Sequence, residues 1–254
     1  MIMILSGTKD GRELVKNLSE RGYPLIVTTA TSYGGSLIQK KEKCTIISNK
    51  LNKNEMETLI VEKGVKILID ATHPYAVEVS ENAMKSCENK KITYMRYQRE
   101  ESKLEGYEKC YQYVSSYEEA VKHLSKIEGN IFLTTGSKTL EIFAKDLEKN
   151  RLFPRILPVS DMIKKCEDLG IKPSNIIAMQ GPFSIEMNME MIKKYKIDIL
   201  VSKESGDIGG TLEKLEAARK MEVPVLLIRR PKVDYKNIFK NTLDVIDKVS
   251  EIYG

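Results

Sequence analysis

A short apolar segment, a turn and an amphipathic segment recur in this order along nearly the whole chain, and this repeat constrains the fold more than any other feature. The apolar segments have the length of single β-strands, and residues 75–89 carry small or apolar side chains at the spacing of one helix face. Strands that alternate with helices form a mostly parallel sheet with helices on both faces. The sequence therefore predicts an α/β fold. The predicted strands are residues 2–5, 25–28, 45–47, 65–69, 93–97, 111–114, 131–134, 152–157, 176–179, 197–201 and 223–228, and the predicted helices are residues 11–21, 54–63, 75–89, 117–127, 138–146, 160–169, 184–195 and 211–221.

A polar, charge-rich stretch at residues 98–109 interrupts this alternation. Such a stretch is typical of a connection between domains. We therefore expect two lobes of ordinary domain size with mostly parallel sheets, residues 1–100 and residues 101–254. Ligands of open parallel sheets bind outside the carboxyl ends of the strands. Two such edges that face each other would form a cleft for a large ligand.

Composition argues against several classes of function. Hydrophobic residues make up 41% of the chain and charged residues 30%, as in soluble globular proteins. We expect no membrane span and no secretory signal, and therefore a cytoplasmic protein. The net charge of +5 comes from interleaved basic and acidic residues, which do not favour nucleic-acid binding. Four cysteines without a CxxC pair and two histidines predict neither disulfides nor a metal site. The sequence gives no indication of the oligomeric state.

The first predicted strand runs directly into the turn Gly7-Thr8-Lys9-Asp10-Gly11-Arg12. Glycines in a strand-to-helix turn let backbone N–H groups approach a pyrophosphate at the helix N-terminus. The turn is not a complete GxGxxG pattern, so it fits equally well a tight turn that binds nothing. We take Gly7, Thr8, Gly11 and Arg12 as candidate cofactor-binding residues.

Hydroxyl side chains dominate the end of the second predicted strand, Thr28-Thr29-Ala30-Thr31-Ser32. Sites specific for NADH usually carry Asp or Glu near this position, where the carboxylate holds the ribose hydroxyls. A site without this carboxylate accommodates a 2′-phosphate, which favours NADPH and does not exclude NADH. Thr28, Thr29 and Ser32 are therefore candidate cofactor-binding residues.

The fourth predicted strand ends in the string Ile69-Asp70-Ala71-Thr72-His73-Pro74-Tyr75. Asp70 and His73 fall at the carboxyl edge of the sheet, beside the expected cofactor, where titratable groups deliver or relay protons. Pro74 suits the first turn of the following helix, which Thr72 or His73 can cap. The alternative is that Asp70 and His73 only bind loop backbone. We take both as candidate catalytic residues.

Three further turns follow predicted strands in the second half of the chain: 134–138, 180–184 and 203–210. Glycines and hydroxyl groups at such turns can bind anions, although each turn alone also fits an ordinary helix start. The candidate cofactor-binding residues in them are Thr135, Gly136, Ser137, Gln180, Gly181, Lys203, Ser205 and Gly206.

In this order, the fragments resemble the precorrin-6A and cobalt-precorrin-6A reductase family of cobalamin biosynthesis. Asp70-Ala71-Thr72-His73-Pro74 resembles the family signature, and the turns and the closing Arg229-Arg230-Pro231 extend the resemblance over nearly the whole chain. The resemblance implies two Rossmann-like lobes that bind NADPH or NADH and a tetrapyrrole. It also implies hydride transfer to one macrocycle double bond, with Asp70 and His73 as candidates for proton delivery and solvent or a substrate carboxyl as the alternatives. The substrate-binding residues that it implies are Thr72, Tyr75, Arg96 and Lys138.

Three other interpretations remain open from the residues alone. Another NAD(P)-dependent reductase with a smaller substrate would share the first turn but would need no large cleft. A non-catalytic binding protein would hinge at residues 98–109 and bind no nicotinamide nucleotide. A nucleotide-sugar transferase is less favoured, because the sequence has no carboxylate pair typical of a metal-diphosphate site.

Overall fold

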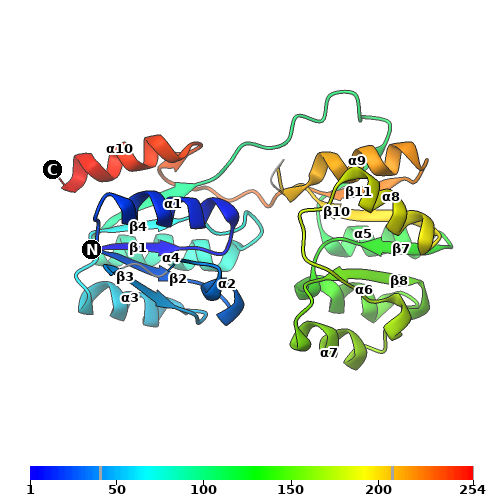
Figure 1. Cartoon of the computed structure of the whole chain (residues 1–254), viewed down its shortest axis with the longest axis horizontal. Coiled ribbons are helices and arrows are strands. Elements are labelled where there is room, and N and C mark those ends of the chain that lie inside the picture. Colours follow the sequence, from blue (N-terminus) through cyan, green and yellow to red (C-terminus); the bar gives the residue numbers. More distant parts are fainter. Residues whose placement is uncertain (40–41, 207–208, 254) are drawn as a thin grey trace. The chain divides into compact units, whose positions relative to one another are not determined.

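The chain divides into two compact units (Figure 1). The computed structural model describes residues 1–39, 42–206 and 209–253. The first unit comprises Met1–Glu100 together with Pro231–Gly254, and the second comprises Glu101–Arg230. The sequence predicts that residues 231–254 belong to the second lobe. This prediction is wrong, because the segment packs with the first unit.

The first unit contains a six-stranded parallel sheet in the order β12-β5-β4-β1-β2-β3. This is the order of doubly wound dinucleotide-binding sheets, with β12 in the sixth place. The predicted strands and helices of this unit agree with the observed ones to within two residues, but the sequence pattern misses α2, β12 and α10. The strands are β1 (Ile2–Leu5), β2 (Leu25–Thr28), β3 (Cys44–Ile47), β4 (Ile67–Asp70), β5 (Thr93–Tyr97) and β12 (Ile238–Phe239), and the helices are α1 (Lys9–Glu20), α2 (Ser32–Ser36), α3 (Lys53–Glu62), α4 (Val77–Lys90) and α10 (Thr242–Tyr253).

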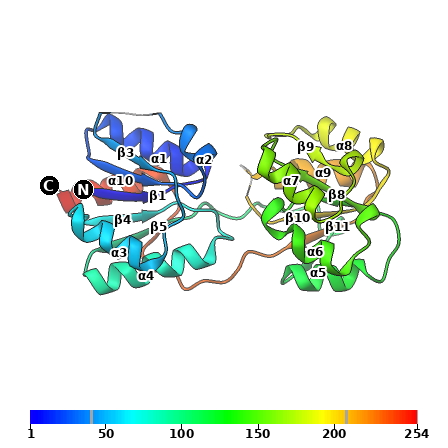
Figure 2. The same cartoon turned by 90° about the horizontal axis from the view of Figure 1, so that it is seen from below.

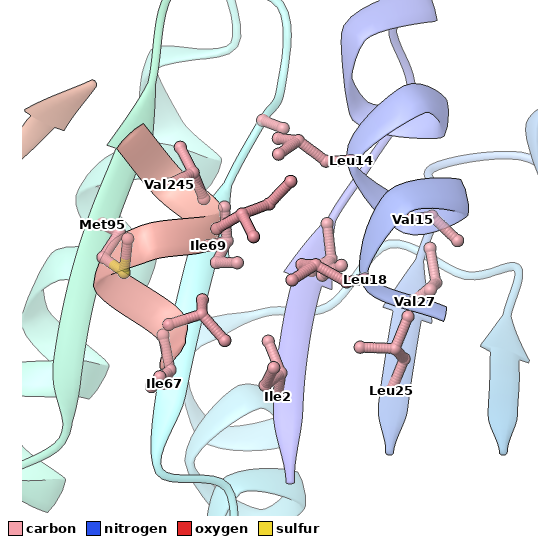
Figure 3. Packing of buried hydrophobic residues seen from close by; sticks show 14 of the residues in the cluster. Ile2, Leu14, Val15, Leu18, Leu25, Val27, Ile67, Ile69, Met95 and Val245 are labelled. Carbon is pink, nitrogen blue, oxygen red and sulfur yellow. The ribbon is translucent and has the colours of Figure 1, made fainter. Parts of the chain in front are cut away.

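The alternation of side chains along the strands divides the core of this unit into two faces. Ile2 and Ile4 of β1 belong to a cluster with residues of α1 and α10, whereas Met3 and Leu5 belong to a cluster with residues of α3 and α4. Figure 3 shows Val245 of α10 over β4 and β5, beside the residues of α1. The C-terminal helix therefore completes the core of the first unit.

The second unit also contains a six-stranded parallel sheet, in the order β6-β11-β10-β7-β8-β9. Residues of α8 and α9 pack on one face of it, and α5 and α6 cover the opposite face (Figure 2). The helix predicted at residues 117–127 ends earlier, at Leu124, where Ser125 becomes the C-cap. The strands are β6 (Tyr111–Val114), β7 (Asn130–Leu133), β8 (Leu152–Ile156), β9 (Ile177–Ala178), β10 (Ile197–Lys203) and β11 (Val225–Ile228), and the helices are α5 (Tyr117–Leu124), α6 (Leu140–Asp146), α7 (Ser160–Asp168), α8 (Ile185–Lys194) and α9 (Thr211–Lys220).

The two sheets share one strand order. In each sheet five strands follow one another along the chain, and one edge strand (β12 in the first sheet, β6 in the second) comes from a separate part of the chain. If the second sheet is counted from β7, then β8, β9, β10 and β11 follow in the positions of β2 to β5, and β6 takes the sixth place. The chain forms β6 before this run, and it returns to the first sheet to pair β12 with β5. This return explains why the C-terminal segment belongs to the first unit.

The connection between β5 and β6, at the residues 98–109 that the sequence predicts to link the two lobes, is partly packed on the second unit. Leu104 is buried and Tyr107 packs against the α8 and α9 face of the second unit. The Tyr107 hydroxyl also donates a hydrogen bond of 3.2 Å to Glu216. Among the described helices, none has the length and apolar character needed to cross a membrane.

Candidate functional site

The first sheet brings the turns after β1 and β4 together. These strands are neighbours, with Leu5 opposite Asp70, and the chain leaves them in opposite directions along the sheet. Such a switch point opens a crevice at the carboxyl ends of the strands. The Thr8 hydroxyl donates a hydrogen bond of 3.0 Å to the Ala71 carbonyl, which joins the two turns. A small pocket there is lined by Thr8, Asp10, Ala71, Thr72, Pro74, Arg96, Tyr97, Gln98 and Arg99.

Two glycines shape the turn after β1 in different ways. Gly7 has a φ of +146°, and a Cβ atom added there would meet no atom within 4 Å, so the backbone is open to a ligand. Gly11 is buried, and a Cβ there would lie 2.7 Å from Ser6 Oγ and 3.3 Å from the Ala71 carbonyl. Gly11 therefore lets α1 pack closely against the ends of β1 and β4, a role distinct from the close pyrophosphate approach that we expect for it.

Thr8 is the N-cap of α1, where its side chain accepts a hydrogen bond of 3.0 Å from the Gly11 N–H. Asp10 lies in the first helical turn and is buried. Its carboxylate forms an ion pair of 2.8 Å with Arg99, which follows β5. The pair compensates the acidic charge at a helix start that would otherwise repel a phosphate.

Asp70 and Arg96 form a fully buried ion pair behind the turn after β4. The Arg96 Nη1 to Asp70 Oδ1 distance is 2.7 Å, and both side chains are 0% exposed. Asp70 Oδ1 also accepts hydrogen bonds from the N–H and hydroxyl of Thr72, at 3.0 and 2.6 Å. Arg96 donates to the Thr72 hydroxyl and carbonyl, both at 3.1 Å. Because Asp70 and Arg96 are buried and bind each other and Thr72, Asp70 is a poor candidate for proton donation and Arg96 is a poor candidate for direct substrate binding.

Two tyrosines complete this buried network, and sequence analysis identifies neither of them. The Tyr94 hydroxyl donates a hydrogen bond of 2.9 Å to Asp70 Oδ2. Burial and then the Asp70 charge raise the pKa of Tyr94 far above its usual value, so the phenol stays protonated. The Arg96 guanidinium lies 4.6 Å from the centre of the Tyr235 ring. Tyr235 belongs to the returning segment before β12, and no local pattern places that segment here.

His73 is half-buried in the turn that follows this network. Its Nδ1 accepts a hydrogen bond of 3.3 Å from the Tyr75 N–H, and the two rings lie 5.4 Å apart. An accepting Nδ1 leaves the proton of a neutral ring on Nε2. The predicted capping arrangement is wrong: Pro74 lies in a turn closed by the Ala76 N–H on the His73 carbonyl, and Ala76 is the N-cap of α4.

The hydroxyl groups after β2 divide into buried and exposed ones. Thr28 and Thr29 are buried, and the Thr29 hydroxyl donates to the Thr31 carbonyl at 3.0 Å, which holds the turn. Thr31 caps α2 by accepting a hydrogen bond from the Gly34 N–H. Thr31 and Ser32 are exposed. Of the candidate residues here, Ser32 is the one accessible to a ligand.

The second sheet has its own switch point, between the neighbouring strands β7 and β10. The turns that contain Thr135 to Lys138 and Lys203 to Gly206 meet there. Burial, and then the nearby charge of Lys138, lower the pKa of Lys203 to about 8. Gln180 and Gly181 are exposed and follow β9, the outermost strand of the second sheet. Asp207 and Ile208 of the predicted turn at residues 203–210 lie outside the described residues.

Lys214 lies close to Lys203 and to a further cation, Arg155, and sequence analysis misses both Lys214 and Arg155. Burial, and then the charges of Arg155 and Lys203, lower the pKa of Lys214 to about 7. Lys214 donates a hydrogen bond of 3.0 Å to the Gly209 carbonyl. Burial lowers the pKa of Arg155, on β8, to about 10, and its guanidinium lies 3.8 Å from the centre of the Phe183 ring. This cationic cluster (Lys138, Arg155, Lys203 and Lys214) also has the carboxylates of Glu204 and Glu213 near Lys214, and its excess of positive charge is suited to an anionic ligand.

The family model described as precorrin-6x reductase CbiJ/CobK matches residues 1–250. This chain belongs to that family. Its curated relatives include several proteins named cobalt-precorrin-6A reductase. The Priestia megaterium protein is 38% identical, over 97% of this chain and 96% of the relative. The Methanocaldococcus jannaschii protein is 34% identical over 99% and 98%, and the Salmonella typhimurium protein is 30% identical over 91% and 87%.

A solved structure titled CobK precorrin-6A reductase supports the fold of this family member. It superposes with a TM-score of 0.81 at 22% sequence identity and covers 98% of this chain and 96% of its own. The fold class predicted from sequence, two Rossmann-like lobes with mostly parallel sheets, is thereby confirmed.

Proposed function

We propose that this chain reduces one carbon–carbon double bond of cobalt-precorrin-6A, or of metal-free precorrin-6A, to give the corresponding precorrin-6B in cytoplasmic cobalamin biosynthesis. One observation carries the proposal. The string Asp70-Ala71-Thr72-His73 ends β4 directly beside the turn after β1, at the switch point where doubly wound sheets bind dinucleotides. The family membership and the names of full-length relatives supply the identity of the substrate.

The residues after β1 and β2 fit a nicotinamide dinucleotide. The open backbone at Gly7 and the N-terminus of α1, where the helix itself gives no partner to its first N–H groups, suit the pyrophosphate. Thr8 shapes this turn as the helix cap, and Arg12 is half-buried one turn further along. The exposed Ser32 hydroxyl, with no Asp or Glu from 28 to 34, favours NADPH over NADH. When bound, the reduced nicotinamide supplies the hydride.

His73 is our candidate for proton delivery to the macrocycle. It is partly accessible, and its Nδ1 contact with the Tyr75 N–H orients Nε2 as the donor. The turn that carries His73 is held in place by hydrogen bonds among Asp70, Thr72 and Arg96, which fix its backbone. We assign these three residues a positioning role and keep Tyr75 as a candidate contact to the substrate.

The substrate carries several carboxylates, and the cationic cluster of the second unit supplies charges of the opposite sign. Lys203 and Lys214 hold lowered pKa values because burial disfavours their charged forms, and an anion would stabilise those forms. We propose that Lys138 and Lys203 bind substrate carboxylates. Further hydroxyl and backbone groups lie at the same switch point and suit the nucleotide or the tetrapyrrole: those of Thr135, Gly136, Ser137, Ser205 and Gly206.

Calorimetric titration with NADPH and NADH separately, followed by addition of cobalt-precorrin-6A or precorrin-6A, tests the proposal. We expect selective binding of one nucleotide and loss of the reduced-nicotinamide absorbance only when a corrinoid is supplied. Failure of both nucleotides to bind, with and without corrinoid, would contradict the reductase. Oxidation by a smaller acceptor but not by either corrinoid would support a different reductase.

The role of His73 has its own test. His73→Ala should lower turnover by about 100-fold or more, the usual contribution of a general acid, while nucleotide affinity stays nearly unchanged. Single-turnover kinetics and nucleotide titration measure the two effects separately. His123→Ala, in the exposed part of α5, is the matched control. Unchanged turnover in His73→Ala would assign the proton to solvent or to the substrate.

A further inference from the structure

Glu204 is a buried carboxylate at the switch point of the second sheet that the proposed reaction does not use. It directly follows Lys203, the last residue of β10, and is 1% exposed. Its Oε1 accepts hydrogen bonds from the N–H groups of Ser102, at 3.2 Å, and Gly206, at 3.0 Å. Its Oε2 contacts Nε of Arg230 in an ion pair that is almost completely buried.

The three partners of Glu204 belong to three different segments. Ser102 lies in the connection that leads from β5 of the first sheet to β6 of the second. Arg230 is the last residue of the second unit before the chain returns to β12. Gly206 lies in the turn that carries Lys203 and Ser205. One carboxylate therefore joins both connections between the units to the proposed ligand-binding turn.

Hydrogen bonds to residues of α9 fix the backbone of the turn after β10, so a bound ligand can shift this backbone only a little. The Ser205 N–H donates to the Thr211 hydroxyl at 3.2 Å, and the Lys214 ammonium donates to the Gly209 carbonyl at 3.0 Å. Gly206 is bonded to Glu204 in the same turn. A shift of Gly206 on ligand binding must therefore move or strengthen the contacts of Glu204, because a buried ion pair is costly to break.

We propose that Glu204 is a positioning residue that couples ligand binding on the turn after β10 to the two chain connections. This proposal rests on the ligand-binding role assigned to Lys203 and Gly206 above. A ligand that orders the turn also orders Ser102 and Arg230 through the shared carboxylate. A purely structural Glu204 would stabilise the second unit to the same extent with and without ligand.

Amide hydrogen exchange, measured residue by residue by NMR, tests the coupling. In the unsubstituted protein, saturation with NADPH and then with cobalt-precorrin-6A should slow exchange at Gly206 and, by at least about tenfold, at Ser102. In Glu204→Gln, which keeps the size and an acceptor oxygen but loses the charge, ligand should still slow Gly206. The effect at Ser102 should fall severalfold, because a neutral acceptor bonds more weakly.

Glu108→Gln is the matched control, since Glu108 lies in the same connection and accepts a hydrogen bond from the Gly106 N–H within that connection. It should leave the ligand effect at Ser102 unchanged. Ligand binding that slows Gly206 but not Ser102 in the unsubstituted protein would overturn the coupling alone. Failure of both ligands to bind would overturn the proposed function together with the coupling. The comparison of exchange at Gly206 and Ser102 uses the unsubstituted protein alone, so it tests the coupling even if Glu204→Gln fails to fold.

Discussion

Among single residues, buried charges occur in two arrangements with opposite consequences. Asp70 and Arg96 compensate each other completely behind the His73 turn. Lys214 lies near the cations Arg155 and Lys203 and near the carboxylates of Glu213 and Glu204, and burial is the largest cause of its lowered pKa. The first arrangement stabilises a turn, whereas at Lys214 burial disfavours the charged form, which an anionic ligand would stabilise.

Asp70→Asn should be strongly destabilising because it leaves the fully buried Arg96 without a carboxylate. Removal of one partner from a buried pair costs about 3 to 5 kcal/mol. Urea unfolding would measure the loss, with the exposed Asp247→Asn as a control that should stay within about 0.5 kcal/mol of the unsubstituted protein. A loss for Asp70→Asn as small as that of the control would contradict the compensating role of the pair.

Lys214 should make the stability of the protein depend on pH. Its pKa of about 7 in the folded state lies below the ordinary lysine value of 10.5, so between these values the unfolded chain binds more protons and stability rises with pH. In Lys214→Met this rise should be smaller by about 1 kcal/mol per pH unit between roughly pH 7.5 and 8.5, a range in which the thiols contribute equally to both proteins. Urea unfolding across this range, with the exposed Lys193→Met as control, checks it. Identical pH profiles for Lys214→Met and the unsubstituted protein would show that Lys214 is not desolvated.

Among the elements, the close approach of α1 to the ends of β1 and β4 shapes the proposed nucleotide site. Gly11→Ala would place a Cβ 2.7 Å from Ser6 Oγ and 3.3 Å from the backbone of Ala71. Although alanine favours helices, such overpacking costs about 1 to 3 kcal/mol. We expect lower stability and weaker nucleotide binding, measured by urea unfolding and titration. Lys16→Ala, on the exposed side of α1, should change neither the stability nor the nucleotide affinity. If Gly11→Ala has as small an effect as Lys16→Ala, the close approach of α1 is not required for either property.

For the whole molecule, the return of the chain to the first sheet makes the last helix part of a distant core. Val245 is 0% exposed and packs in one cluster with Ile2 and Ile69. Val245→Ala should cost about 2 kcal/mol through lost burial and the cavity left behind. Hydrogen exchange should therefore accelerate in β1 and β4 but not in β7 and β10. Leu124→Ala, in α5, should show the reverse pattern, and acceleration throughout both units by either change would mean that they unfold together.

Local sequence patterns identify the turns that line the candidate site, but they do not show which side chains are buried there or which partners these side chains contact. The position of Asp70 and His73 after β4 follows from the strand pattern and from the rule that ligands bind at carboxyl edges. The contacts of Asp70 with Arg96 and Tyr94, and of Arg96 with Tyr235, do not follow from local pattern, because these partners come from β5 and from the returning segment. For the same reason, Glu204 and Lys214 show no distinguishing signal in their own surroundings.

The sequence by itself determined the succession of strands and helices, because apolar spacing and helix caps act between residues that are close along the chain. It also determined the family, through an ordered set of short strings. Only the tertiary structure decided that β12 and α10 complete the first unit, that two switch points form, and that one carboxylate joins three segments at Glu204. These features depend on pairing and burial between residues far apart in sequence, where the two-residue β12 has too little pattern of its own to reveal its partner.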